Sequence, residues 1–115
     1  MSLTLPLIAL GGAAGSVLRY LMVSAIGAPL GTAAVNVLGS LAIGALFVLI
    51  PREGWQLFLI TGLLGGFTTF SAFSLDTLRL VEAGHPLQAV AYVLGSVALS
   101  LVAVALGVAI ARSLA

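Results

Sequence analysis

Long apolar runs separated by short turns make up almost the whole chain. A helix that crosses a bilayer needs about 20 mostly apolar residues. The pattern predicts four such helices, over residues 4–26, 30–50, 55–82 and 86–113. The breaks between the runs contain Gly and Pro, which are typical of turns. The four arginines and three acidic residues all lie at or near the ends of the runs. We therefore expect an all-α integral membrane protein with a single four-helix membrane domain.

The composition supports this expectation and excludes several classes of function. Only 6% of the 115 residues are charged, whereas a soluble domain carries roughly 25%. The net charge of +1 argues against nucleic-acid binding, which needs clustered Lys and Arg. No basic segment precedes the first apolar run, so we expect no cleavable signal peptide. An enzyme is not expected, because one histidine, no cysteine and three scattered acids offer no acid–base constellation.

The third apolar run contains the stretch that is least typical of a spanning helix. Residues 62–74 include three glycines, two adjacent threonines and three phenylalanines. Glycine weakens a helix through backbone entropy, and a Thr-Thr pair weakens it through crowding. In lipid, backbone groups freed by a break must find partners inside the protein or line a polar cavity. The stretch therefore predicts a broken third helix with an ion or substrate site near the membrane midplane.

A polar stripe runs along the second predicted helix. Thr32, Asn36 and Ser40 are spaced i, i+4, i+8 and so share one face. The hydroxyls of Thr32 and Ser40 either line a pathway or bond back to the helix backbone. The Asn36 amide cannot satisfy its donors and its acceptor locally, so it should face protein or water.

The third and fourth helices offer two further groups of polar or aromatic side chains. Tyr92, Ser96 and Ser100 repeat the i, i+4, i+8 spacing, and Phe70 and Phe73 share a face if helix resumes at Phe70. Without a buried charge among them, these groups form a plausible path for a small ion.

Residues near the helix ends allow simpler interpretations. Gly11 and Gly15 form a small-xxx-small pair, for which close helix packing is the favoured interpretation. Arg19 either reaches toward an interface or attracts anions at a vestibule. Asp76 and Arg79 are expected to form an i,i+3 ion pair.

The arginines give no preferred orientation in the membrane. Orientation normally follows the Lys and Arg bias of the flanking loops. Arg52 and Arg112 fall on one side of the predicted bundle, and Arg19 and Arg79 fall on the other. The chain could therefore insert both ways and pair antiparallel about a two-fold axis near the break. An oligomer is expected in any case, because four small helices leave little room for a pore.

The chain resembles the bacterial fluoride channels known as Fluc or CrcB over essentially its whole length. The glycine-, threonine- and phenylalanine-rich run is the most specific part of the likeness, whereas the glycine-rich start alone would be weak. The resemblance rests on residues 11–20, on Gly31, Thr32, Val35, Asn36 and Gly39, and on residues 65–74.

The resemblance implies passive fluoride export across the bacterial cytoplasmic membrane, which relieves fluoride toxicity. It implies an antiparallel dual-topology homodimer with two pores and a structural sodium ion at its centre. By motif position, the backbone carbonyls of Gly65 and Thr68 would hold the sodium ion. Ala72 stands where many members have Thr, and Asp76 where many have Glu. The fluoride pathway would comprise Asn36, Phe70, Phe73, Tyr92, Ser96, Ser100 and Arg19.

Two other classes of membrane protein remain as alternatives. A small multidrug-resistance-type exporter also has four short spans and dual topology, but its mechanism needs a glutamate in the first span. Residues 4–26 contain no carboxylate. A structural subunit whose glycines only pack helices would not account for the Gly-Thr-Phe run together with Asn36.

Overall fold

The computed structural model describes residues 3–115, which are helical except at short connections. Four helices are long and apolar enough to cross a membrane, which confirms the prediction of four helices with that capacity. The third span, Glu53–Glu82, is made of several consecutive segments. The elements are α1 (Thr4–Ile26), α2 (Leu30–Leu49), α3 (Glu53–Gln56), η1 (Leu57–Leu64), α4 (Gly65–Phe67), α5 (Phe70–Glu82) and α6 (Pro86–Leu114).

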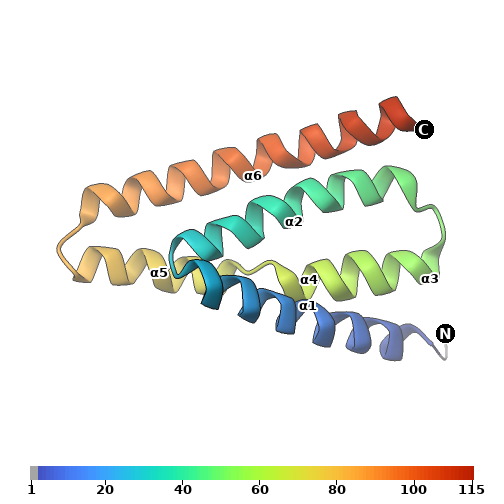
Figure 1. Cartoon of the computed structure of the whole chain (residues 1–115), viewed down its shortest axis with the longest axis horizontal. Helices are drawn as coiled ribbons and strands as arrows, with labels where there is room; N and C mark the ends of the chain where they lie inside the picture. The colour runs from blue at the N-terminus through green and yellow to red at the C-terminus, as the bar shows by residue number, and fades with distance from the viewer. Residues whose placement is uncertain (1–2) are drawn as a thin grey trace.

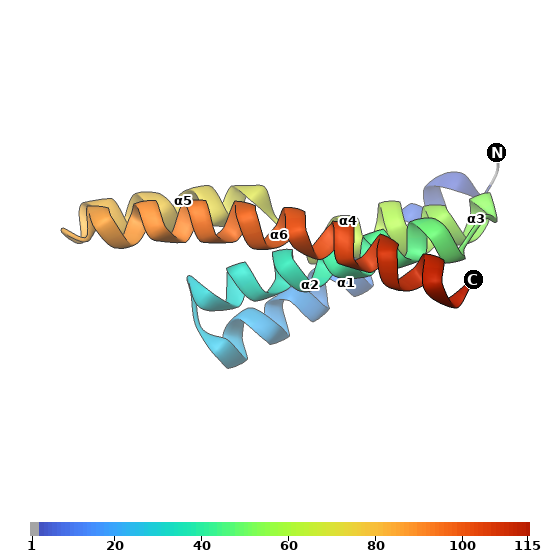
Figure 2. The same cartoon turned by 90° about the horizontal axis from the view of Figure 1, so that it is seen from above.

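The helices lie roughly along one long axis and form two main packing pairs. α2 packs chiefly against α6, and α1 packs chiefly against η1 and α4. The start of α1, the C-terminus and the connection from α2 to α3 lie at one end of the bundle (Figure 1). At the other end, the α5–α6 hairpin extends beyond the turn between α1 and α2 (Figure 2). Arg52 and Arg112 therefore belong to the first end, and Arg19 and Arg79 lie toward the second.

Glycines allow the close approach of α1 to the third span. Gly11 and Gly15 are both buried. A Cβ at Gly11 would collide with the carbonyl oxygen of Phe58, and one at Gly15 would collide with that of Leu63. The small-xxx-small pair thus brings two backbones into contact, as its packing interpretation predicts.

The third span is interrupted near its middle. Helix α4 ends at Phe67, and Thr68 and Thr69 are extended, with φ/ψ of −87°/158° and −154°/122°. Helix resumes at Phe70, where the Thr69 hydroxyl caps α5 by accepting a hydrogen bond from the Ala72 N–H. The eight residues Leu57–Leu64 before the break form a π-helix, η1, which the hydropathy pattern did not indicate.

A second close approach, between α2 and α6, gives a direct test of the packing. A Cβ at Gly107 would collide with the carbonyl oxygen of Leu41, whereas one at Gly95 on the same helix would have no atom within 4 Å. We expect Gly107→Ala to lower thermal stability by about 1–3 kcal/mol, because overpacking forces the helices apart. Gly95→Ala should be neutral or slightly stabilising, since Ala favours helix. Thermal unfolding of the purified variants measures both effects, and equal melting temperatures would contradict this packing.

Candidate ion pathway

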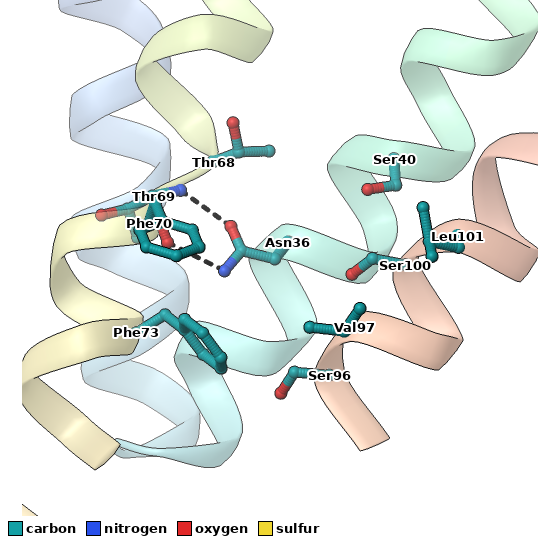
Figure 3. Close-up of a pocket in the computed structure, with 10 residues that line it drawn as sticks. All are labelled: Asn36, Ser40, Thr68, Thr69, Phe70, Phe73, Ser96, Val97, Ser100 and Leu101. Carbon is teal, nitrogen blue, oxygen red and sulfur yellow. Dashed lines mark hydrogen bonds between the residues drawn. The ribbon is translucent and has the colours of Figure 1, made fainter. Parts of the chain in front are cut away.

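A cleft of about 320 Å³ lies between α2, α6 and the start of α5. Figure 3 shows the polar side chains of α2 and α6 facing the two phenylalanine rings across it. Among the described residues that line the cleft, none carries a charge. The lining residues are Asn36, Ser40, Thr68, Thr69, Phe70, Phe73, Ser96, Val97, Ser100 and Leu101.

The cleft brings together five of the seven predicted pathway residues. Tyr92 lies next to it, since its ring packs on Phe73 with the ring centres 5.2 Å apart. Arg19 lines a different cavity. The five that meet in the cleft are Asn36, Phe70, Phe73, Ser96 and Ser100.

Asn36 is hydrogen-bonded to the backbone of the break in both directions. Its Nδ2 donates to the carbonyl oxygen of Thr69 at 2.9 Å, and its Oδ1 accepts from the Thr69 N–H at 2.7 Å. Figure 3 shows this pair of bonds joining α2 to the extended segment. The side chain thus pairs one donor and its acceptor with the protein and also lines the cleft, in keeping with the expectation that it faces protein or water.

The two phenylalanines of the cleft have very different surroundings. Phe70 is 76% exposed, whereas Phe73 is 8% exposed and lies between Phe70 and Tyr92. The Phe70 and Phe73 ring centres are 5.5 Å apart, with the planes tilted by 59°. Phe73 is therefore packed inside this chain, whereas the Phe70 ring is largely exposed on the surface of the chain.

Asp76 does not pair with Arg79 in the part of the chain that the structure describes, so the predicted ion pair is wrong. The Asp76 side chain is 6% exposed, and its Oδ2 accepts a hydrogen bond from the Tyr92 hydroxyl at 3.3 Å. Arg79 is exposed. The reason is rotational position: Asp76 lies on the side of α5 that packs against α6, and an exposed arginine gains little from a surface pair.

A second cavity, of about 560 Å³, lies between α1, α2 and α5. Arg19 lines it, so the structure brings Arg19 beside the break but not into the cleft. Thr69 lines both cavities, so both reach the break. The lining residues are Ser16, Arg19, Tyr20, Val23, Ser24, Thr32, Thr69, Ser71, Ala72 and Leu75.

The two backbone carbonyls predicted to hold sodium lose their normal helical partners. In a continuous helix, the N–H of Thr69 would bond the Gly65 carbonyl, and the N–H of Ala72 would bond that of Thr68. Here the Thr69 N–H donates to Asn36 and the Ala72 N–H donates to the Thr69 hydroxyl. Gly65 is also exposed on the surface of the chain. The break thus releases these oxygens and leaves the Gly65 position uncovered.

Thr69 is the residue of this site that sequence reasoning missed. Its sequence signal is a threonine directly before a helical run, which is typical of an N-cap. That signal predicts the bond to Ala72 but not the bonds to Asn36, which is 33 positions away in the chain.

Four apolar spans around an uncharged polar cleft define a helical membrane protein with a candidate solute pathway. Residues 6–108 match a family described as "CrcB-like protein, Camphor Resistance (CrcB)", and the chain belongs to this family. It is similar to proteins named "Fluoride-specific ion channel FluC". The identity is 51% over 115 residues with the protein of Paracoccus denitrificans (strain Pd 1222), covering 93% of each chain.

Other relatives carry the same name. The protein of Rhizobium johnstonii (strain DSM 114642 / LMG 32736 / 3841) is 50% identical over 122 residues, covering 95% of this chain and 96% of its own. The protein of Agrobacterium fabrum (strain C58 / ATCC 33970) is 44% identical over 123 residues, covering 97% and 98%. The family is one of ion channels and not of enzymes.

Proposed function

We propose that this protein is a fluoride channel that lets fluoride leave the bacterial cytoplasm across the inner membrane and so relieves its toxicity. The observation that carries the proposal is the uncharged cleft, which gathers an amide, two aromatic rings and serine hydroxyls from three spans. The choice of fluoride as the ion comes from the names of the relatives at about 50% identity.

The chemistry of the cleft suits a small, strongly hydrated anion. The edge of an aromatic ring is electropositive, so an anion can pass along the edges of Phe70 and Phe73. The Asn36 amide and the hydroxyls of Ser96 and Ser100 can replace hydrogen bonds from water. Because no fixed positive charge lines the cleft, the anion is not trapped there, and conduction requires such release. Arg19 would raise the anion concentration in the second cavity, beside the break.

We propose further that the working unit is an antiparallel homodimer with two pores. The support is the uncovered face of the break, where Gly65, Phe70 and Ser71 are exposed in the single chain. Released carbonyls cannot face lipid in the interior of a membrane, since no water is there to pair with them. A second copy that covers this face solves the problem, and the arginines divided equally between the two ends allow it to insert inverted.

The same face also supports the proposal of a structural sodium ion at the dimer centre. A hard cation prefers oxygen ligands, and channels hold such ions with rings of backbone carbonyls. The Gly65 and Thr68 carbonyls are released by the break, so the oxygen donors fit. Two copies would contribute four oxygens. Bound sodium would supply positive charge to carbonyls that otherwise lack a partner.

Fluoride efflux from liposomes tests the proposed function. Vesicles that contain the purified protein and a potassium fluoride load are expected to release fluoride within seconds to minutes once a potassium ionophore balances the charge. Protein-free vesicles should retain most of the load over the same period, which controls for leakage. Equal release from both preparations would contradict the proposal.

A further inference from the structure

The structure points to a role for Asn36 beyond contact with the passing anion: we propose that it is the positioning residue that keeps the third span broken and thereby holds the sodium site open. This inference rests on the proposed function, because it connects the anion pathway to the proposed cation site. Asn36 belongs to α2, whereas both sites are built around the break between α4 and α5.

The first step of the argument is the geometry of the two hydrogen bonds. Asn36 donates to the carbonyl and accepts from the N–H of one residue, Thr69, at 2.9 and 2.7 Å. A backbone peptide in a neighbouring β-strand offers the same pair of groups. The side-chain amide therefore replaces a strand partner and stabilises the extended φ/ψ of Thr69 in a region without a sheet.

The second step is what these bonds prevent. If the Thr69 N–H were not bound to Asn36, its nearest alternative would be a helical bond to the Gly65 carbonyl. That bond would close the break and remove one of the two proposed sodium ligands. Burial strongly favours this helical bond over an unpaired N–H, because Thr69 is 8% exposed and an unpaired buried amide is costly. Asn36 thus decides whether the Gly65 oxygen is available.

The third step is why the neighbouring polar residue cannot substitute. Ser40 lies one turn further along α2 and lines the same cleft, but the structure assigns it no bond to the break. A hydroxyl also lacks the fixed spacing of donor and acceptor that an amide has. The Asn36 amide has a second N–H, which is not needed for Thr69 and can serve an anion in the cleft. One side chain would then contact the fluoride path and fix the cation site.

The test compares Asn36→Ala with Ser40→Ala, a matched loss of a polar group from the same face of α2. The thermal unfolding temperature of the purified dimer is measured against sodium concentration in fluoride-free buffer. Asn36→Ala is expected to raise the sodium concentration for half-maximal stabilisation at least tenfold, whereas Ser40→Ala should leave it unchanged. An Asn36→Ala protein with the wild-type sodium dependence would overturn the proposal, and so would a wild-type protein that sodium does not stabilise.

Hydrogen exchange gives a second measurement that needs neither fluoride nor a fully stable variant. In the wild-type protein the Thr69 amide is expected to exchange slowly despite the interrupted helix, because its N–H donates to the Asn36 Oδ1. Fast exchange of Thr69 in the wild type would overturn the proposal. Fluoride efflux is assayed separately, so a protein that shows these effects but passes no fluoride would contradict only the proposed function.

Discussion

Replacing Phe70 by Ile is expected to reduce fluoride efflux at least about tenfold, which corresponds to about 1.4 kcal/mol in barrier height. Isoleucine keeps the apolar surface but has no electropositive ring edge, so the anion loses that contact. Phe70 is 76% exposed in the single chain, and its replacement removes little packing within that chain. The fold of the single chain should therefore be unchanged, and because isoleucine keeps an apolar side chain on the face proposed to meet the second copy, the dimer should still assemble. Efflux from liposomes together with size-exclusion chromatography measures both properties.

The chain provides a matched control for this substitution. Phe47 on α2 is also exposed, at 63%, but does not line the cleft. Phe47→Ile should leave efflux unchanged. Phe73→Ile should reduce efflux as Phe70→Ile does and also lower stability by about 1 kcal/mol, because Phe73 is buried against Tyr92. Wild-type flux through Phe70→Ile would assign that ring to packing in the dimer and contradict its place in the path.

Removal of sodium is the second change with a large expected effect. Dialysis against a large organic cation should lower the melting temperature and abolish efflux, because the Gly65 and Thr68 carbonyls, the proposed sodium ligands, would lose the bound ion. A ligand present at about a hundred times its Kd stabilises the folded state by about 2.7 kcal/mol, and stability should fall by that order. The loss should be slow if the ion lies at the centre of the dimer, and adding sodium back should reverse it.

The control for sodium removal keeps the ionic strength and the chloride concentration constant. Any loss of stability or flux is then due to the absence of sodium and not to a general salt effect. If neither stability nor flux changes when sodium is exchanged, the proposed sodium site is wrong, and the carbonyls of the break must have another partner.

The sequence predicts the helices and the break well, because both depend on local properties. Runs of apolar residues determine the four spans, and the glycines and paired threonines of residues 62–74 weaken helix where the structure interrupts it at Thr68 and Thr69. The bounds of the first span are an example, since α1 covers Thr4–Ile26, the range that hydropathy predicts.

Features that depend on packing between distant segments could not be predicted in this way. The π-helix η1 lies where the backbone of the third span meets Gly11 and Gly15, and hydropathy carries no information about that register. The partner of Asn36 lies 33 positions away, and only the fold brings it near. The prediction of an ion pair between Asp76 and Arg79 is wrong for the same reason, because helical spacing alone does not show that Asp76 faces Tyr92 of α6.

The most direct test of the central claim is the comparison of fluoride and chloride efflux from vesicles that contain the same purified protein. An uncharged path of ring edges, one amide and a few hydroxyls should favour the smaller anion, so fluoride should leave rapidly while chloride is largely retained. Equal rates for the two anions, or no fluoride release above that of protein-free vesicles, would contradict the account.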